Sequence, residues 1–440
     1  MKQKINVGII GLGTVGIGTL RILRENKELI QRRVGVPIEV TKIAVRDVKR
    51  DRGMTLPAEM LTTNPAQIIE DPSIDIVVEL IGGYEPAREL ILSAIARGKH
   101  VVTANKALLA VHGSEINEEA RRAGVTIGFE GSVGGGIPVI KALKEALAAN
   151  RILSIYGIIN GTSNYILTKM TEEERSFSDV LAEAQRAGYA EADPTFDVGG
   201  IDTAHKLAIL VNLAFSASVD LKQIYTEGIT SISPLDIDFG KALGYKLKLL
   251  AIAKMHEGGK AEARVHPTMV PDEYPIAKVG GVYNAVQIVG DACADIMLYG
   301  RGAGSLPTGS AVVGDIMDIA RQILMEPSRK LPANDTPDAG ASGVRVQLQP
   351  IESITSLYYF RLMALDQPGV LAQISGILGR HRISIAQMIQ RGRKEGGSVP
   401  LVIMTHKALE RDIQKALVEI KTLSCITEEP VLIRVEGEEP

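Results

Sequence analysis

The chain has 440 residues, more than one hydrophobic core usually holds, so its length predicts about two to four domains. Hydrophobic residues make up 45% of the sequence, charged residues 23%, and the formal net charge is −3, a balance that favours neither a nucleic-acid nor a membrane partner. Two cysteines, Cys293 and Cys425, are too few for a disulfide framework or a thiolate zinc site. Because the start of the sequence also lacks signal-peptide character, we expect a cytoplasmic protein.

The N-terminal segment carries a dinucleotide-binding pattern. Residues 5–10 are a β-branched run typical of a strand, and residues 19–32 show helical periodicity. Between them the glycine spacing G-x-G-x-x-G permits a tight turn, close approach of backbone to a pyrophosphate, and close packing of helix on strand. The alternative is a glycine-rich turn that binds no nucleotide. We expect cofactor contacts from Gly11, Gly13, Thr14, Val15 and Gly16.

The end of the next predicted strand, residues 38–45, bears on the choice of cofactor. In this position Arg46 precedes Asp47. An arginine suits the 2′-phosphate of NADP(H) better than a free ribose hydroxyl, whereas an acidic residue suits NAD(H). We therefore predict NADP(H) as the preferred cofactor, with NAD(H) as the alternative if Asp47 binds the ribose.

Strand-like and helical runs then alternate, which predicts a doubly wound parallel sheet. Residues 74–81 and 100–103 read as strands, and the polar residues after them should face the same crevice as the glycine loop. Thr103 and Lys106 lie in such a loop. Lys106 is placed for an anionic group of the cofactor or substrate, although a solvated lysine at a helix start is the plain alternative.

A second glycine-rich segment follows the strand-like residues 125–130. The run of residues 131–137 would let main-chain groups approach a ligand or an ion, with a flexible linker as the alternative, and Pro138 should open a helix to about residue 149. Beyond residue 150 the alternation stops. Strands are expected at 152–159, 247–255, 263–270 and 282–289, a loop at 300–308, and a helix at 310–324 that returns to the first domain.

The central stretch, residues 188–206, concentrates charge next to a buried helix. Its carboxylates are Glu191, Asp193, Asp197 and Asp202, and its lysine is Lys206. The run from residue 201 is apolar on nearly every side and should be buried, where aspartate and lysine are rare without a partner or a task. Asp202 and Lys206 stand four residues apart and so share one helical face. The alternative is an exposed pair worth only about 0.3–0.5 kcal/mol.

The C-terminal part reads as a separate module behind a linker. Proline and small polar residues predict a linker around 327–353. Residues 358–365, 370–380, 383–389, 400–405, 407–420 and 430–435 follow in the order βαββαβ, which is the ferredoxin-like arrangement.

These motifs together resemble the homoserine dehydrogenase family, in the bacterial form with a C-terminal ACT module. The most specific match is Gly188-Tyr189-Ala190-Glu191-Ala192-Asp193-Pro194 with Asp197, Gly199, Asp202 and Lys206. Supporting matches are Thr103-Ala104-Asn105-Lys106, Ser132-Val133-Gly134-Gly135-Gly136-Ile137-Pro138, Asn160-Gly161-Thr162-Ser163-Asn164-Tyr165, and Gly302-Ala303-Gly304 with Pro307-Thr308. The turn Leu365-Asp366-Gln367-Pro368-Gly369-Val370-Leu371 is similar to that of ACT modules.

The resemblance implies interconversion of L-aspartate 4-semialdehyde and L-homoserine, with hydride exchanged at the nicotinamide. It implies Lys206 as proton donor and acceptor with Asp202 orienting it, since the alkoxide formed from an aldehyde needs a proton. Substrate binding would fall to Glu191, Asp197, Asp202 and Lys106, with further cofactor contacts from Thr103, Lys106, Gly188 and Gly302. A monovalent cation, Na+ or K+, would bind at Glu130, Val133, Gly135 and Ile137.

The expected architecture is therefore α/β and α+β in three domains. A Rossmann domain would span residues 1–150 with 301–326, a mixed substrate-binding and dimerisation domain 151–300, and an ACT regulatory domain 354–440. Threonine is the first candidate effector by family analogy, and unpaired sheet edges favour a homodimer or homotetramer. An ACT-bearing hydroxyacid dehydrogenase and a non-catalytic regulator that senses NADPH and an amino acid are the alternatives.

Overall fold

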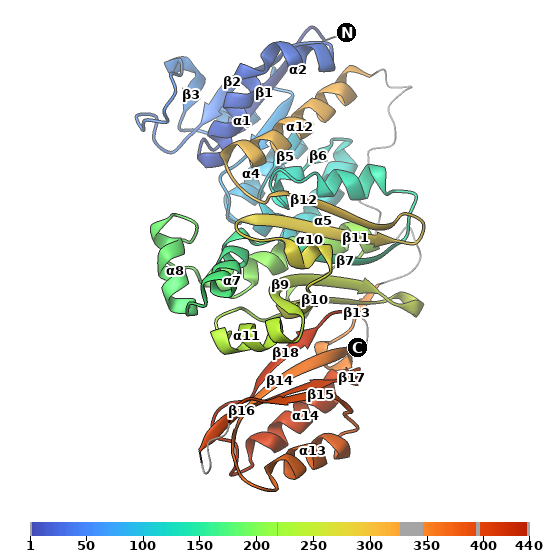
Figure 1. Cartoon of the computed structure of the whole chain (residues 1–440). Coiled ribbons are helices and arrows are strands. Elements are labelled where there is room, and N and C mark those ends of the chain that lie inside the picture. Colours follow the sequence, from blue (N-terminus) through green and yellow to red (C-terminus); the bar gives the residue numbers. More distant parts are fainter. Residues whose placement is uncertain (1, 218, 326–345, 393–396, 438–440) are drawn as a thin grey trace. The chain divides into compact units, whose positions relative to one another are not determined.

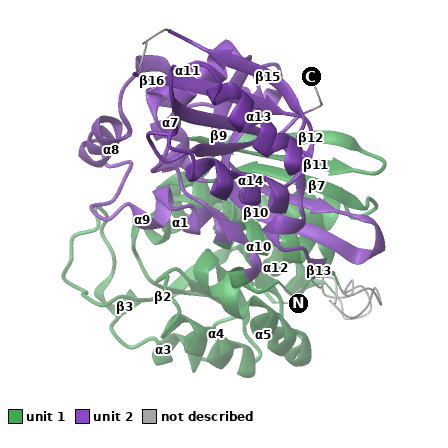
Figure 2. Cartoon of the chain, turned by 90° about the horizontal axis from the view of Figure 1, so that it is seen from below, with its two compact units in different colours: residues 1–159, 205–222, 283–346 green, residues 160–204, 223–282, 347–440 purple. Residues whose placement is uncertain are grey.

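The computed structural model describes residues 2–217, 219–325, 346–392 and 397–437. The chain forms two compact units, coloured separately in Figure 2. Unit 1 contains residues 1–159, 205–222 and 283–346, and unit 2 contains the other three segments. One boundary falls inside helix α10 (Ile201–Phe215), so this single helix contributes to both units. Most of the expected linker at 327–353 lies outside the described residues, and the expected domain boundaries stay a prediction.

Unit 1 is built around a parallel sheet with the strand order β3-β2-β1-β4-β5-β6 (Figure 1). β1 pairs in parallel with β2 on one side and with β4 on the other, so the strand order reverses beside β1. This reversal creates the crevice in which doubly wound sheets bind ligands. The strands are β1 (Ile5–Ile10), β2 (Ile38–Ala44), β3 (Leu61–Thr62), β4 (Ile76–Glu79), β5 (His100–Thr103) and β6 (Ile127–Gly128).

The single helix predicted after β1 begins earlier than expected and is divided in two. α1 (Thr14–Glu25) begins five residues before the expected position, because the glycine loop itself forms the first turn and Gly13 is the N-cap. Asn26 then takes a non-helical conformation, which separates α1 from α2 (Lys27–Val34). Asparagine competes with the helical backbone for hydrogen bonds, which accounts for a break at this residue.

Helix α12 (Ser305–Leu324) packs against α1 through glycines that leave no room for a side chain. A Cβ added at Gly18 would lie 2.0 Å from the carbonyl oxygen of Ser305, and one at Gly309 would lie 2.7 Å from the Thr19 nitrogen. α12 also starts before the expected residue 310, because Pro307 fits into the first turn rather than the preceding loop. Together the two helices bury one core with the sheet, including Leu20 and Val312.

The rest of unit 1 corrects two predictions. β7 (Ile152–Ile158) and β11 (Tyr283–Gly290) lie where strands were expected and pair antiparallel, but β12 (Ala294–Arg301) forms an antiparallel partner of β11 that the sequence did not indicate. Five of the eight residues of β12 are exposed and none is buried, so its apolar pattern is weak. The helix predicted to run to residue 149 is a short α6 (Val139–Lys141) followed by a π-helical segment, η3 (Ala142–Ala146). The remaining elements are η1 (Ala58–Met60), α3 (Ala66–Ile69), α4 (Ala87–Ala96), α5 (Lys106–Ala123) and η2 (Glu130–Ser132).

Unit 2 is organised on a mixed sheet with the order β9-β10-β18-β14-β16-β15 (Figure 1). β10 pairs antiparallel with β9 and parallel with β18. The C-terminal strand β18 thus joins the sheet formed by residues 223–282, the middle segment of unit 2. The expected βαββαβ module is confirmed by the order β14, α13, β15, β16, α14, β18. The strands are β8 (Tyr225–Thr226), β9 (Tyr245–Met255), β10 (Lys260–Pro271), β13 (Gln347–Leu348), β14 (Thr355–Leu365), β15 (Ile385–Gln390), β16 (Ser398–Thr405), β17 (Ala408–Leu409) and β18 (Val431–Val435).

The predicted helices of unit 2 lie close to their expected positions: α13 (Val370–Arg380) begins at Val370 as expected and α14 (Glu410–Lys421) begins three residues later than expected, at Glu410. α7 (Gly161–Glu173) begins directly after Asn160, because the Asn160 side chain caps it and accepts a hydrogen bond from the Ser163 nitrogen. The other helices are α8 (Phe177–Arg186), α9 (Thr195–Val198), α11 (Pro234–Ala242), η5 (Glu257–Gly259), η6 (Pro275–Lys278) and η8 (Ile351–Ser353). Every helix in the described ranges is too short or too polar to cross a lipid bilayer.

Candidate active site

The glycine loop of unit 1 has the shape of a nucleotide cradle. Gly11 has a φ of +102°, and a Cβ there would lie 2.7 Å from the carbonyl carbon of Leu80, whereas a Cβ at Gly13 would meet no atom within 4 Å. Open space above the second glycine is what a pyrophosphate needs to approach the backbone. At Gly16 a Cβ would lie 2.4 Å from the Gly11 oxygen, so the third glycine permits the turn to close. The loop residues therefore fit a dinucleotide.

A buried glutamate that the sequence analysis missed organises the neighbouring loops. Glu79 ends β4, and its carboxylate accepts the amides of Ile81 and Gly82 at 2.7 and 3.1 Å. Its second oxygen accepts the hydroxyl of Thr103 at 2.7 Å. Glu79 thus ties the end of β4 to the end of β5. A charged residue that ends an apolar strand run was the available signal.

Asn105 and Lys106 follow Thr103 at the start of α5. The Asn105 side chain caps the helix by accepting from the Leu108 nitrogen at 3.2 Å and donates to the Gly83 oxygen at 2.6 Å. Lys106 is the first residue of the helix and is half-buried. Lys106 therefore lies at the N-terminus of α5, directly after the loop that Asn105 links to Gly83 beyond the end of β4. Arg46 lies just after β2 and is exposed.

The second glycine loop is held between Glu130 and α12. The Glu130 carboxylate accepts the amides of Ile140 and Lys141 at 2.9 and 2.8 Å, which makes it the anionic cap of α6, and burial raises its pKa. The Glu130 nitrogen donates to Asp315 on α12 at 2.8 Å, and burial raises the pKa of Asp315 to about 7. Glu130 is thus buried, and Asp315 is half-buried beside it.

Residues of the expected cation site lie along this same loop. Val133, Gly135 and Ile137 are buried, and Gly135 has a φ of +57°. A Cβ at Gly135 would lie 2.5 Å from the Gly302 oxygen, and one at Gly302 would lie 1.9 Å from Asn284. The loop is therefore pressed against the segment before α12. Among the described residues no cluster of three histidine, cysteine or acidic side chains could hold a metal ion, so a cation here would bind mainly backbone oxygens.

Two consecutive residues, Ile159 and Asn160, contact both Lys206 and the carboxylates before it. Lys206 is 8% exposed, and its ammonium donates to the Ile159 carbonyl oxygen at 2.7 Å. The next residue, Asn160, donates from its amide nitrogen to Asp197 at 2.7 Å and to Asp202 at 2.8 Å. Asp202 is 2% exposed in the first turn of α10. Burial on one helical face is therefore as expected, but the direct link between the two aspartates and Asn160 was not foreseen.

Two other predicted site residues lie outside this cluster. Glu191 is exposed in the segment after α8, and its backbone oxygen accepts from Gln185 at 3.1 Å. Gly188, just before it, has a φ of +74°, which only glycine adopts readily. Neither is among the residues that Asn160 holds.

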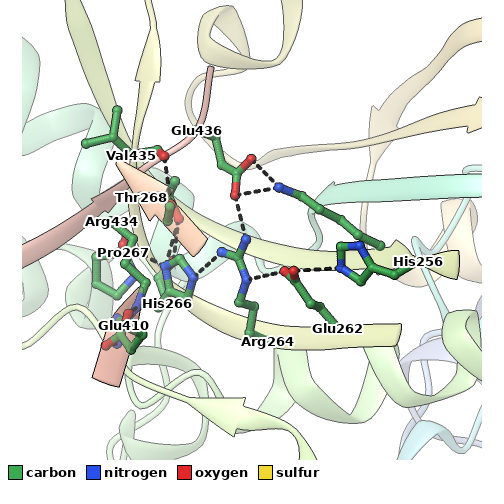
Figure 3. Close-up of polar contacts among 12 residues, drawn as sticks. His256, Glu262, Arg264, His266, Pro267, Thr268, Glu410, Arg434, Val435 and Glu436 are labelled. Atoms are coloured by element: carbon green, nitrogen blue, oxygen red, sulfur yellow. Dashed lines mark hydrogen bonds and ion pairs between the residues drawn. The ribbon is translucent and has the colours of Figure 1, made fainter. Parts of the chain in front are cut away.

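A second polar cluster lies within unit 2, where β18 meets β10 (Figure 3). Arg434 binds Glu410 through two nitrogens at 2.6 and 2.9 Å and Glu227 through the third at 2.9 Å. Arg264 donates to Glu436 and to the Nε2 of His266, each at 2.7 Å. Because arginine cannot accept, His266 is neutral with its proton on Nδ1, and burial together with the two arginines keeps its pKa well below the usual range. This arginine cluster joins the C-terminal module to the middle segment.

Comparison with known proteins identifies the family. A family model described as homoserine dehydrogenase matches residues 138–317, its NAD-binding domain matches residues 11–130, and an ACT domain model matches residues 358–424. The homoserine dehydrogenase of Pseudomonas aeruginosa is 49% identical over 438 residues, which cover 99% of each chain. The chain belongs to the homoserine dehydrogenase family. Its members are oxidoreductases that act on a CH–OH group, and both alternatives considered from the sequence are therefore disfavoured.

Solved structures of homoserine dehydrogenases extend the match to the fold. The structure from Thiobacillus denitrificans superimposes with a TM-score of 0.92 at 48% identity and covers 98% of each chain. A hyperthermophilic archaeal homoserine dehydrogenase mutant, solved in complex with NADPH, gives a TM-score of 0.61 at 26% identity and covers 74% of this chain and all of that one. The predicted fold class, with a Rossmann-type domain, a mixed domain and a C-terminal ACT domain, is confirmed.

Proposed function

We propose that this chain interconverts L-aspartate 4-semialdehyde and L-homoserine with Lys206 as the proton donor and acceptor. The observation that carries the proposal is the buried ammonium of Lys206, fixed on the Ile159 oxygen and one helical turn after Asp202. A bound nicotinamide would supply and remove the hydride. Lys206 would give a proton to the oxygen of the aldehyde carbon as it is reduced and take the proton back in the reverse direction.

The acidic residues before Lys206 suit the ammonium group of the amino-acid substrate. Asp197 and Asp202 share one amide donor, which brings two anions together in a place where Asp202 has little access to water. Such a pair attracts a cation, and an ammonium with three donors can serve several carboxylates at once. We assign Asp197, Asp202 and Glu191 to substrate binding, with Asp202 also orienting Lys206. Glu191 is exposed and would have to approach the substrate when it binds.

We assign the cofactor site to the glycine loop residues Gly11, Gly13, Thr14, Val15 and Gly16, with Thr103, Lys106, Gly188 and Gly302 as further contacts. Arg46 supports NADP(H) as the preferred cofactor, because it is exposed just after β2, where the ribose of the adenosine binds in this type of fold. The NADPH complex of the archaeal relative is consistent with this choice.

We expect the chain to oxidise NADPH in the presence of L-aspartate 4-semialdehyde with a higher kcat/KM than NADH. Arg46→Ala should lower kcat/KM for NADPH by about 10–100-fold, since a charge-assisted hydrogen bond contributes about 1.5–3 kcal/mol, while kcat/KM for NADH changes little. Asp47→Ala is the matched control. If that change lowers the use of NADH and Arg46→Ala leaves the NADPH value intact, the assignment to Arg46 is wrong. No oxidation of either cofactor would contradict the proposed reaction.

We also propose a monovalent cation at Glu130, Val133, Gly135 and Ile137. These residues fit such an ion, since they offer backbone carbonyls and one carboxylate on a loop with positive-φ glycines, and hard cations prefer oxygen ligands. The buried Glu130, whose pKa is raised by burial, would gain a compensating charge. The ion would hold the loop against α6 and take no part in proton transfer.

We infer that the ACT domain regulates the enzyme, with L-threonine as the first effector to test. The arginine cluster supports a path from this domain, because Arg434 in β18 binds Glu227, and Glu436, directly after β18, binds Arg264 of the middle segment. Removing the ACT domain would also remove the partners of Glu227 and Arg264. Regulation should therefore be measured on the full chain.

L-Threonine is expected to inhibit homoserine oxidation by the full chain at millimolar concentration, and D-threonine is expected to have no effect. Steady-state rates at fixed NADP+ and homoserine measure this, with L-threonine titrated to saturation. A direct competition with homoserine would place threonine in the active site instead of the ACT domain. Equal rates with and without L-threonine would eliminate threonine as the effector.

Self-association is a further part of the proposal. Among the described strands β12 is an edge strand that pairs only with β11, and it exposes Met297 and Tyr299. Exposed edge strands with apolar side chains favour pairing between subunits, which supports a homodimer or homotetramer. Both cysteines are free, in keeping with the reducing cytoplasm expected from the sequence.

A further inference from the structure

Asn160 occupies the junction between the candidate lysine and the candidate carboxylates. It follows β7 directly and precedes α7, and it is 5% exposed. Its amide nitrogen donates to Oδ1 of Asp197 at 2.7 Å and to Oδ2 of Asp202 at 2.8 Å. One side-chain amide therefore supplies both of its N–H groups to two carboxylates that lie five residues apart in the sequence.

The orientation of this amide is fixed from its other end. Oδ1 of Asn160 accepts the Ser163 nitrogen at 2.8 Å and so caps α7. A flipped amide would set its oxygen against two carboxylates and its NH2 group against a backbone N–H, and all three contacts would become unfavourable. The helix cap thus determines where the two N–H groups point. Asp197 is held a second time, since the Ser163 hydroxyl donates to its backbone oxygen at 3.0 Å.

The same residue is linked to Lys206 through the chain. The carbonyl that accepts the Lys206 ammonium belongs to Ile159, and the peptide bond of this carbonyl joins Ile159 to Asn160. A peptide unit is planar and rigid, so the position of the Ile159 oxygen and the position of the Asn160 backbone are set together. The position of this one peptide therefore affects both the acceptor of Lys206 and the donor to the two carboxylates.

The region that carries Asp197 and Asp202 is itself closely packed. Gly200, between α9 and α10, has a φ of +82°, and a Cβ there would lie 3.2 Å from side-chain atoms of Thr226 and Val265. At Gly228 a Cβ would lie 2.2 Å from the Val198 oxygen. Such contacts restrict the backbone of Asp197 and Asp202. Their side-chain torsion angles are then set by the hydrogen bonds from the Asn160 amide.

We propose that Asn160 is a positioning residue for the amino-acid substrate, because it sets the separation and direction of the Asp197 and Asp202 carboxylates that receive the substrate ammonium. This inference rests on the proposed function for the identity of the substrate. Asn160 contacts neither the hydride nor the transferred proton and acts through the two aspartates.

Two substitutions separate positioning from helix capping. Serine and aspartate cap helices about as well as asparagine, so Asn160→Ser and Asn160→Asp both keep the α7 cap. Serine is too short to bridge the two carboxylates, and aspartate adds a third anion beside them. The KM for homoserine should rise by about 10–100-fold in Asn160→Ser, as for other residues that orient ligand-binding groups, and further in Asn160→Asp. Binding of NADP+ should change little in both variants, whereas the unfolding temperature should fall more in Asn160→Asp than in Asn160→Ser, because aspartate adds a buried anion.

A matched control is available one turn further along the same helix. Asn164 is also buried, and it donates to the Gly281 oxygen at 3.1 Å and accepts from the Lys248 ammonium at 3.5 Å, so both of these contacts are with residues 223–282. Asn164→Ser should affect stability without raising the KM for homoserine. A double variant, Asn160→Ser with Asp197→Asn, should lose little more than Asp197→Asn alone, because both changes break the same contact.

The outcomes are distinguishable. A KM for homoserine that stays within twofold of the unaltered chain in Asn160→Ser and Asn160→Asp would overturn the inference, as would an equal rise in Asn164→Ser. Fully additive losses in the double variant would also overturn it. If the unaltered chain fails to oxidise homoserine with NADP+, the proposed function falls first and this inference falls with it.

Discussion

Lys206→Ala is expected to lower kcat by about 10²–10⁴-fold in both directions, the range that a positioned general acid or base contributes. Lys206 is buried with its ammonium 2.7 Å from the Ile159 oxygen, so no bulk water can take over its position without rearrangement. Binding of NADPH should persist within about twofold, because the glycine loop is a separate part of the chain. Steady-state rates with homoserine and with aspartate semialdehyde, together with a fluorescence titration of NADPH, measure the two effects.

The control for this change is another buried lysine of the same unit. Lys99 is 5% exposed and donates to the Ile74 oxygen at 2.8 Å, so it resembles Lys206 in burial and in its backbone acceptor. Lys99→Ala should lower stability but leave kcat nearly unchanged. Lys206→Arg should not restore activity, because a guanidinium does not release its proton. Near-normal semialdehyde reduction by Lys206→Ala would move the proton donor to Lys106 or to water.

Arg434→Met is expected to lower the free energy of unfolding by about 3–5 kcal/mol, the usual cost of removing one partner of a buried ion pair. Arg434 is 2% exposed and Glu410 is 1% exposed, so the variant leaves a carboxylate in the protein interior without its cation. The double variant Arg434→Met with Glu410→Leu should recover much of the loss, since the charge is then removed as well. Urea unfolding followed by circular dichroism measures all three proteins.

An exposed ion pair in the same unit provides the comparison. Arg391 donates to Asp238 at 2.7 Å, and these two side chains are 45% and 60% exposed. Arg391→Met should cost less than about 1 kcal/mol, because solvent screens such a pair. If Arg434→Met costs no more than Arg391→Met, the arginine cluster does not stabilise the junction of β18 and β10.

Local patterns predicted most of the elements, and their failures have physical causes. The period of the apolar residues located β1, β5, α10 and α13, because each buries a regular face. Helix starts were placed late at α1 and α12, since the glycine loop and a proline in the first turn add residues that have no apolar period. β12 was missed because most of its residues face solvent.

The candidate site was less accessible to sequence reasoning. The pair of Asp202 and Lys206 followed from their spacing on a buried helix, which needs only local geometry. Glu79 and Asn160 act through contacts with residues 24, 37 and 42 positions away, and no local pattern encodes such distances. For Asn160 the sequence indicated only a match to a family motif.

The packing of α12 on α1 has a consequence for how this protein is made. The core of the first sheet includes Val312 and Ile316, which leave the ribosome only after some 300 residues have been synthesised. Until then the nascent chain carries β1 and α1 with part of their apolar surface uncovered, and at about 5–20 residues per second this interval lasts many seconds. The unit with the dinucleotide-binding loop thus starts to fold first during translation but completes its core late. Its exposed apolar surface makes it a substrate for a chaperone during this interval.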